Sequence, residues 1–213
     1  MSINIADLRK DYSLKMLSEV DVARLPLDQF QKWWDEAIKS EILEVNAMTL
    51  ATCDCYGKPS ARIVLLKGLN EDGFIFFTNY ESRKGKELKE NPFASLVFFW
   101  KELERQVRVE GTIRMTSENE SDTYFNSRPI KSKLSSWSSP QSQVVTNREV
   151  LENTVLEYEK QFKEGYIPRP KQWGGYILFP TVIEFWQGRR SRLHDRIRYT
   201  LMGSEWRIER LAP

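Results

Sequence analysis

Three short apolar runs that follow one another closely limit the folds open to this chain. Strand-like residues occupy positions 48–53, 61–67 and 74–79. Turn-forming residues separate them, with Tyr56-Gly57-Lys58-Pro59 in the first gap and Asn70-Glu71-Asp72-Gly73 in the second. Runs of this length joined by turns of this kind predict two consecutive hairpins in an antiparallel meander.

Similar patterns continue through the rest of the 213 residues. Further strands are expected at 93–100, 104–115, 175–179, 182–187, 193–201 and 205–211. Helices are expected at 27–42, 82–91, 117–126, 130–137 and 147–163, with Ser82 and Asn147 as N-caps. Residues 1–24 are polar and are expected to form an N-terminal arm. Strands without a βαβ rhythm predict a single domain over residues 1–213, mainly β with α, built as an antiparallel barrel with helices on its outside.

Composition excludes several classes of protein. Hydrophobic residues make up 40% of the chain, enough for a sizeable core, and a formal net charge of only +2 argues against a protein that coats nucleic acid. No apolar run approaches the roughly 20 residues of a membrane span, and the N-terminus lacks a signal-peptide layout, so a cytoplasmic protein is expected. A disulfide between Cys53 and Cys55 would be strained, and with one His they make no zinc site, so free thiols and no metal are expected.

The strand at 61–67 carries a cation near each end, Arg62 and Lys67. Successive strand side chains point to opposite faces, and these two residues differ by an odd number of positions. We therefore expect them to leave the strand on opposite sides, where each can meet a different anionic group. The alternative is that both charges cap the strand in solvent.

Two further features are compatible with a small-molecule ligand, one with its phosphate and the other with its ring. Ser82-Arg83-Lys84 opens a helix, and free backbone N–H groups beside two cations form a plausible phosphate cradle. Gln106 shares a strand face with Arg108 and Glu110 and can read the edge of a heterocycle. Basic helix starts and solvent-facing polar strand residues are also common. The alternatives are therefore that the basic residues only begin a helix and that Gln106 only faces solvent.

The C-terminal stretch from Trp186 to Pro213 holds seven Arg against three acidic residues, which suggests anionic small-molecule groups or a local acidic surface. It includes Arg192-Leu193-His194-Asp195-Arg196, with the only His of the chain. On a strand, Arg192, His194 and Arg196 share a face, which suits a pocket for a planar anionic ligand. A structural role for His194 is the alternative. The chain has no glycine-rich dinucleotide motif, nucleotide P-loop or nucleophile elbow.

The motif Arg192-Leu193-His194-Asp195-Arg196, preceded by Phe185-Trp186-Gln187-Gly188, belongs to a series of motifs along the chain. The others are Arg62-Ile63-Val64-Leu65-Leu66-Lys67, Phe77-Thr78-Asn79, Ser82-Arg83-Lys84, Glu104-Arg105-Gln106-Val107, Tyr124-Phe125-Asn126-Ser127-Arg128-Pro129, Gln141-Ser142 and Arg210-Leu211-Ala212-Pro213. In this order, and over nearly the whole chain, the series resembles the pyridoxine (pyridoxamine) 5′-phosphate oxidase family of FMN enzymes. The resemblance implies a split antiparallel β-barrel flanked by helices, and a homodimer with sites at the subunit interface and a C-terminal dimerisation region at 170–213.

The resemblance also implies residue roles. The implied FMN-binding residues are Arg62, Ile63, Val64, Leu65, Leu66, Lys67, Phe77, Thr78, Ser82, Arg83, Lys84, Gln106, Gln141, Ser142, Trp186 and Arg196. Of these, Gln141, Ser142, Trp186 and Arg196 are expected from the other subunit. The implied substrate-binding residues are Arg9, Lys10, Asp11, Tyr12, Lys67, Tyr124, Arg128, Ser132, Arg192, Leu193 and His194. Arg192 and His194 are expected to be catalytic, and residues 9–12 to form a lid.

The implied reaction oxidises pyridoxine 5′-phosphate or pyridoxamine 5′-phosphate to pyridoxal 5′-phosphate. FMN and O2 take part, hydrogen peroxide leaves, and the amine also releases ammonia. Three positions depart from the family pattern, Phe77 for Tyr, Asn126 for His and Pro140 for Lys. Two alternatives remain open: a split-barrel flavin protein with another substrate, such as a flavin reductase, and a non-enzyme that carries pyridoxal phosphate or binds nucleic acid.

Overall fold

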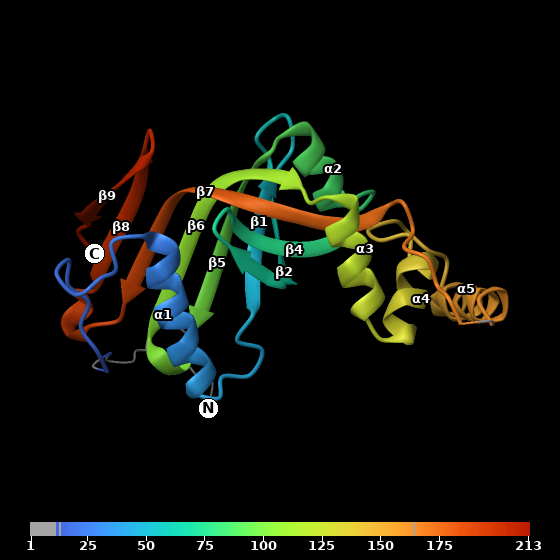
Figure 1. Ribbon diagram of the computed structural model, residues 1–213, viewed down its shortest axis with the longest axis horizontal. Coiled ribbons are helices and arrows are strands. Elements are labelled where there is room, and N and C mark those ends of the chain that lie inside the picture. The colour runs from blue at the N-terminus through green and yellow to red at the C-terminus, as the bar shows by residue number, and fades with distance from the viewer. Residues whose placement is uncertain (1–11, 13, 164) are drawn as a thin grey trace, which may run out of the picture. The chain divides into compact units, whose positions relative to one another are not determined.

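The computed structural model describes residues 12, 14–163 and 165–213, and the chain divides into two compact units. Unit 1 comprises Met1–Thr49, Ser95–Gly111 and Pro180–Pro213, and unit 2 comprises Leu50–Ala94 and Thr112–Phe179. The strands β1 (Ala47–Cys53), β5 (Phe93–Trp100), β6 (Arg105–Met115) and β7 (Trp173–Gln187) contribute residues to both units (Figure 1). The sheet order is β2 (Pro59–Leu65), β1, β5, β6, β7, β4 (Gly73–Asn79) and β3 (Gly68–Asn70), with β8 (Asp195–Met202) joined to β7 and β9 (Glu205–Arg210) joined to β8.

Unit 1 packs helix α1 (Pro26–Lys39) against aromatic strand residues. Pro26 opens the helix, one residue before the predicted start, and the buried side chains of Phe30 and Trp33 pack in the core. The Phe30 ring lies 5.1 Å from Phe98, and the Trp33 ring lies 5.2 Å from Phe185. The helix ends at Lys39 instead of the predicted residue 42, because Glu41 adopts a left-handed backbone with φ of 53°.

The C-terminal strands complete unit 1. Strand β8 (Asp195–Met202) pairs antiparallel with β7 from Val182↔Thr200 to Gln187↔Asp195, and β9 (Glu205–Arg210) pairs with β8. The two strands predicted at 175–179 and 182–187 form the single strand β7. Pro180 breaks the apolar pattern in the sequence. In the fold it lies between the pairing of β7 with β4, which ends at Leu178, and that with β8, which begins at Val182.

In unit 2 the predicted meander of two consecutive hairpins is only partly formed: β2 pairs with β1, but it does not pair with β4, whose partners in the sheet are β7 and β3. Strand β2 (Pro59–Leu65) is followed by the short strand β3 (Gly68–Asn70), which was not predicted, and by β4 (Gly73–Asn79). Asn70 forms the predicted turn, because its Oδ1 accepts hydrogen bonds from the backbone N–H groups of Asp72 and Gly73. Strand β4 pairs antiparallel with β7 from Phe74↔Leu178 to Asn79↔Trp173. The antiparallel fold class is therefore confirmed.

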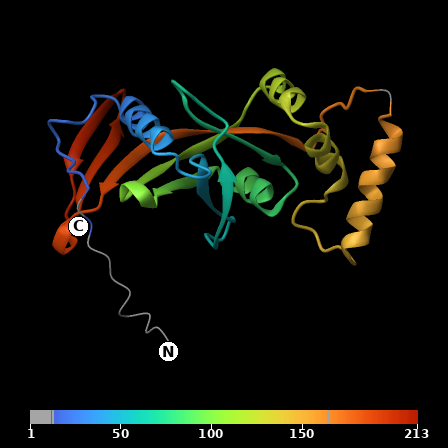
Figure 2. The same cartoon turned by 90° about the horizontal axis from the view of Figure 1, so that it is seen from below.

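Four helices of unit 2 begin at or near their predicted residues. They are α2 (Arg83–Glu90), α3 (Glu118–Ser127), α4 (Ile130–Ser138) and α5 (Arg148–Gln161). Ser82 and Asn147 are confirmed as N-caps, since their side chains accept from the N–H groups of Gly85 and Val150. Helix α5 lies beside α4, with Trp137 of α4 5.5 Å from Tyr158 (Figure 2).

Helix α2 docks very closely on the loop before it. A Cβ atom added at Gly85 would lie 2.1 Å from the Tyr80 carbonyl oxygen, so only glycine fits there. This contact fixes the first turn of α2, where Arg83 and Lys84 are located, against the end of β4.

Candidate ligand-binding site

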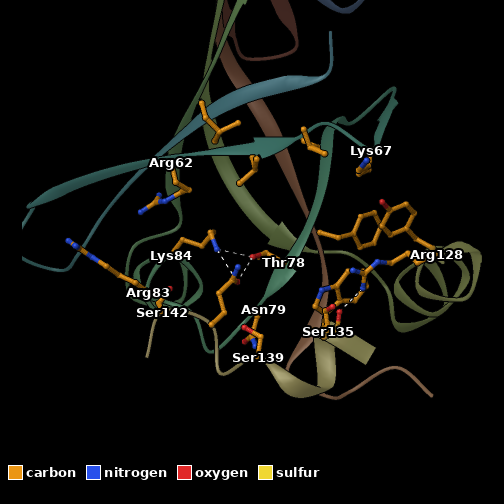
Figure 3. A pocket seen from close by; sticks show the side chains of 18 of the residues that line it. Arg62, Lys67, Thr78, Asn79, Arg83, Lys84, Arg128, Ser135, Ser139 and Ser142 are labelled. Carbon is orange, nitrogen blue, oxygen red and sulfur yellow. Dashed lines mark hydrogen bonds between the residues drawn. The ribbon is translucent and has the colours of Figure 1, made fainter. Parts of the chain in front are cut away.

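A cavity of about 780 Å³ opens in unit 2, a size that suits a small ligand or cofactor. It is lined by Ser60, Ala61, Arg62, Ile63, Val64, Leu65, Lys67, Phe77, Thr78, Asn79, Arg83, Lys84, Tyr124, Arg128, Ser135, Ser136, Ser139, Gln141, Ser142 and Trp173. Figure 3 shows its cations in two groups, with Arg62, Arg83 and Lys84 toward one end and Lys67 and Arg128 toward the other. The cavity therefore offers two separate positions for anionic groups.

Lys84 is the most deeply buried cation of the first group, with 7% of its surface exposed. Its Nζ donates to Thr78 Oγ1 at 2.9 Å, and to Ser82 Oγ and Gln141 Oε1 at 3.2 Å. Burial, and then the charge of Arg62, lower the pKa of Lys84 to about 8. Among the described residues, Lys84 forms no ion pair with a carboxylate. A buried ammonium held only by neutral oxygens calls for an anionic ligand.

The other two cations of this group share one carboxylate. Arg62 Nη2 lies 3.4 Å and Arg83 Nε lies 2.8 Å from the carboxylate of Glu87, which is buried on α2. Arg62 also donates to the Leu50 carbonyl and the Thr52 hydroxyl. Three cations and the first turn of a helix thus converge on one end of the cavity.

At the opposite end, Arg128 is held by neutral groups. Its guanidinium lies 4.5 Å above the Trp173 ring and donates to Ser136 Oγ at 2.6 Å. Trp173, Phe77 and Tyr124 are stacked, with Phe77 4.0 Å from Tyr124 and 5.6 Å from Trp173. Burial lowers the pKa of Arg128. Neither Arg128 nor Lys67 pairs with a carboxylate in the described part of the chain, so this end also suits an anion.

Arg62 and Lys67 both line the same cavity, so the prediction that they serve different sides of the sheet is wrong. The reason is that β2 ends at Leu65, and Lys67 follows it in a non-strand segment whose N–H donates to the Ile75 carbonyl. Strand alternation therefore does not reach Lys67. The alternative in which both cations only cap the strand in solvent is also unsupported, because both side chains line the cavity.

Unit 1 brings together a second group of candidate residues. The His194 ring lies 4.6 Å from Trp186 and 5.9 Å from Tyr12. The backbone N–H of Arg189 donates to His194 Nδ1 at 3.1 Å, which leaves Nε2 to carry the proton of the neutral ring. Burial and the charge of Arg192 lower the pKa of His194, which favours this neutral form. His194 can therefore donate a hydrogen bond through Nε2.

Arg192, His194 and Arg196 do not share a strand face, contrary to the prediction. The strand expected at 193–201 begins at Asp195, and Arg190–Arg192 form a 3₁₀ turn. Ser191 and Arg192 have positive φ angles of 56° and 61°, so the backbone there is left-handed and not extended. Only Arg196 lies on β8, where it forms hydrogen bonds of 2.8 and 3.1 Å to the buried Glu184.

Comparisons with known proteins give one consistent result. Residues 34–162 match the family model described as pyridoxamine 5′-phosphate oxidase, and residues 173–213 match the pyridoxine 5′-phosphate oxidase C-terminal dimerisation region. A Cyanothece sp. protein named pyridoxine/pyridoxamine 5′-phosphate oxidase is 57% identical over 213 residues and is covered in full, as is this chain. The protein of the same name from Cupriavidus necator is 57% identical over 98% of this chain and 99% of its own length.

The chain belongs to the pyridoxamine 5′-phosphate oxidase family. Among solved structures, PhzG from Burkholderia lata, in complex with tetrahydrophenazine-1-carboxylic acid, superposes with a TM-score of 0.89. It is 31% identical, and the match covers 94% of this chain and 100% of PhzG. A family-related FMN-binding protein from Nostoc punctiforme has a TM-score of 0.71 at 17% identity and supports the fold alone.

The site residues implied by the family resemblance can now be compared with the structure. Most of those in unit 2 line the cavity, whereas Leu66 and Ser82 are buried outside its lining and Ser132 does not contribute to it. Gln106, Trp186, Arg192, Leu193, His194 and Arg196 belong to unit 1. Arg9, Lys10 and Asp11 of the predicted lid lie outside the described residues.

Gln141 and Ser142 were expected from a second subunit, but the structure places both in the cavity of their own chain. Gln141 Oε1 accepts from Thr78 and Lys84 of that chain, so the helix α4 to α5 connection supplies it locally. The resemblance implied that these residues bind FMN and that the other subunit provides them; the first implication stays a prediction, and the second does not agree with their place in this chain.

Several cavity residues escaped the sequence reasoning: Ser60, Ala61, Asn79, Ser135, Ser136, Ser139 and Trp173. Ser60 lies two residues before Arg62, so strand alternation alone would have found it. No sequence signal separates Trp173 from a core residue. The described residues hold no cluster of three or more His, Cys, Asp or Glu side chains suited to a metal ion, and none of their helices has the length and apolar character needed to cross a lipid bilayer.

Proposed function

We propose that this chain oxidises pyridoxine 5′-phosphate and pyridoxamine 5′-phosphate to pyridoxal 5′-phosphate, with FMN as cofactor and O2 as electron acceptor. The observation that carries the proposal is the pair of cation groups at two ends of one cavity, Lys84 with two arginines at one end and Lys67 with Arg128 at the other. Each group suits one phosphate, and FMN and substrate carry one each. Relatives that are 57% identical over the full chain bear the corresponding enzyme name.

The chemistry of the first group fits the FMN phosphate. Lys84, Arg83 and Arg62 supply positive charge, and Thr78 adds a hydroxyl beside the first turn of α2. Lys84 lacks a carboxylate partner among the described residues, as a cation that awaits a phosphate should. When bound, FMN supplies a two-electron acceptor that oxygen can reoxidise. Gln106, Gln141 and Ser142 are proposed to contact the rest of the cofactor.

The second group is proposed to hold the substrate phosphate. Lys67 and Arg128 supply the charge, and Tyr124, stacked on Phe77, closes this end of the cavity. Arg128 reaches the cavity with its guanidinium plane already fixed by Trp173 and Ser136. Fixing both phosphates limits the relative orientation of the two rings, which is the main contribution that a protein makes to such a reaction.

Arg192 and His194 are proposed to contact the substrate pyridine ring, with His194 donating a hydrogen bond from Nε2. We further propose a homodimer in which Trp186 and Arg196 act on the site of the partner, since residues 173–213 match the family's dimerisation region. The protein thereby aligns the 4′ carbon of the substrate for loss of hydride. The alcohol then gives the aldehyde directly, whereas the amine gives an imine that water hydrolyses to aldehyde and ammonia. Oxygen leaves as hydrogen peroxide in both cases.

The test is spectroscopic. Protein purified with FMN should be yellow, and pyridoxine 5′-phosphate should bleach it anaerobically; air should restore the colour with one hydrogen peroxide per pyridoxal 5′-phosphate formed. A yellow protein that this substrate does not bleach would support a flavin protein with another substrate. A protein that never retains flavin would support the carrier or nucleic-acid-binding alternative.

Arg192→Leu tests the assigned catalytic role. We expect turnover to fall by about 100-fold, since an interaction with the reacting ring is lost, while the flavin content is unchanged. Arg190→Leu is the matched control in the same turn. An unchanged rate for Arg192→Leu contradicts the role.

A further inference from the structure

Glu87 is a buried carboxylate beside the cavity proposed to bind phosphates, where it contacts the lining residues Ser60, Arg62 and Arg83, and the proposed reaction does not use it. Only 5% of its surface is exposed. Its Oε2 accepts from the Thr52 hydroxyl at 2.5 Å and the Ser60 hydroxyl at 2.6 Å, and Arg62 Nη2 lies 3.4 Å away. Its Oε1 accepts from Arg83 Nε at 2.8 Å. An acidic group so close to an anion site needs a physical reason.

The two hydroxyl groups form bridges between Glu87 and Arg62. Arg62 Nη1 donates to Thr52 Oγ1 at 2.5 Å, and Arg62 Nη2 donates to Ser60 Oγ. Each hydroxyl therefore accepts a hydrogen bond from Arg62 and donates one to Glu87. Together with the bond from Arg62 to the Leu50 carbonyl at 3.1 Å, this arrangement fixes the plane of the Arg62 guanidinium.

The charges of this end of the cavity also balance. Arg62, Arg83 and Lys84 carry three positive charges, and Glu87 carries one negative charge, which leaves +2. Burial raises the pKa of Glu87, but hydrogen bonds from Ser60, Thr52 and Arg83 outweigh it and hold the pKa at about 2, so the carboxylate stays ionised. A phosphate monoester carries close to two negative charges at neutral pH and would neutralise the remainder.

We propose that Glu87 is a positioning residue for the FMN phosphate: through Thr52, Ser60 and direct ion pairs it holds Arg62 and Arg83 in the orientation that the phosphate meets. The inference rests on the proposed function, because it requires FMN at this end of the cavity. A purely structural tie between α2 and the neighbouring strands is the competing explanation. The two differ in one respect, since positioning of the arginines matters only for a ligand that carries a phosphate.

The experiment compares FMN with riboflavin, which lacks the phosphate, as ligands of the apoprotein of wild type, Glu87→Gln and Glu90→Gln. Glu90 lies on the same helix and is exposed. Flavin fluorescence quenching gives the dissociation constants. For Glu87→Gln we expect FMN to bind about tenfold more weakly, the size of one lost charge-assisted interaction, and riboflavin to bind as in wild type. Glu90→Gln should leave both constants unchanged.

Ser60→Ala provides a milder second variant, because it removes one bridge and keeps the carboxylate. We expect a smaller loss of FMN affinity, about threefold, again without an effect on riboflavin. This variant decides the question if Glu87→Gln does not fold.

Two results overturn the inference. One is an unchanged FMN constant in Glu87→Gln or, if that variant does not fold, in Ser60→Ala; the other is an equal loss for FMN and riboflavin, which identifies a structural tie. Wild-type protein that binds no FMN contradicts the proposed function itself, so the two failures are distinguishable.

Discussion

The two units of the molecule treat their cationic side chains in different ways. In unit 1 most of the described arginines pair with carboxylates, among them Arg105 with Glu36, Arg196 with Glu184, Arg198 with Glu209, and Arg210 with Glu19 and Asp195. In the cavity of unit 2, Lys67, Lys84 and Arg128 have no carboxylate partner among the described residues. Neutral oxygens and an aromatic ring hold Lys84 and Arg128 instead.

We interpret this difference as a division between cations that mainly stabilise the fold and cations proposed to bind a ligand, although Arg62, Arg83 and Arg196 pair with carboxylates and are also proposed to act on a ligand. The C-terminal excess of arginine illustrates it. Of the seven arginines, Arg189, Arg196, Arg198, Arg207 and Arg210 pair with acids, which leaves Arg190 and Arg192 without a carboxylate in the described part of the chain. Most of the charge that suggested an anionic ligand is therefore balanced internally. Arg192, the proposed catalytic residue, is one of the two exceptions.

The strongest test of the comparison removes a buried arginine that pairs with a carboxylate. Arg105 is 3% exposed, pairs with Glu36 at 2.9 Å, donates to Gln187 and lies 4.2 Å above the Trp33 ring. Arg105→Met should lower the free energy of unfolding by about 3 kcal/mol, because it breaks a largely buried ion pair. Urea denaturation measures the change. Arg198→Met, at a more exposed pair, should lower it by less than about 1 kcal/mol, and equal losses would contradict the distinction.

Removal of a cation without a carboxylate partner should weaken ligand binding and leave the stability of the apoprotein unchanged. Lys84→Met should weaken FMN binding about 30-fold, because a charge-assisted contact with the phosphate is lost. The apoprotein should be no less stable, since the burial that lowers the pKa of Lys84 opposes folding of the charged form. Flavin titration and thermal denaturation of the apoprotein measure the two effects. A marked loss of apoprotein stability would place Lys84 with the structural cations.

Lys84 also predicts a pH dependence. It keeps its proton up to its ordinary pKa of 10.5 in the unfolded chain but only to about 8 in the folded apoprotein. The unfolded state binds more protons between these values, so the apoprotein should gain stability as the pH rises through this window. FMN binding must restore the proton, so its dissociation constant should rise about 5.5-fold from pH 8 to pH 9, as the protonated fraction of Lys84 falls from about one half to about one eleventh. Lys84→Met should show neither change.

The smallest expected effect concerns the other end of the cavity. Arg128→Lys keeps the charge but loses the planar contact with Trp173 and the bond to Ser136. The KM for pyridoxine 5′-phosphate should rise about fivefold with little change in kcat, because the contact holds the substrate phosphate and not the reacting carbon. Steady-state kinetics measure both constants. A fall in kcat alone would contradict the assignment.

Local signals predicted the parts of the fold that depend on local chemistry. The Asn70 turn and the caps Ser82 and Asn147 were correct, because a side chain and its nearest backbone groups decide them. The continuity of β7 through Pro180 and the late start of β8 were missed. Both depend on which strand pairs with which, and no window of sequence contains that information.

The site was predictable to a similar degree. Arg62, Arg83 and Lys84 were found from their motifs, but the reasoning that linked Arg62 to Lys67 assumed a strand longer than the real one. Glu87 was invisible, since Lys86-Glu87-Leu88-Lys89-Glu90 reads as a solvated helix face. Its burial becomes evident only once β1 and β2 bring Thr52 and Ser60 to it.

The left-handed turn at Ser191 and Arg192 limits how this protein can be engineered. Two consecutive non-glycine residues adopt this left-handed backbone, at a cost in conformational free energy of about 1–3 kcal/mol each. Glycine at either position would ordinarily be the designer's first choice for a more heat-resistant protein. At position 192 it deletes the guanidinium that is proposed to contact the substrate, and at position 191 it loosens the turn that carries this side chain. Thermostable variants should therefore be sought among exposed apolar positions such as Val144, far along the chain from this turn.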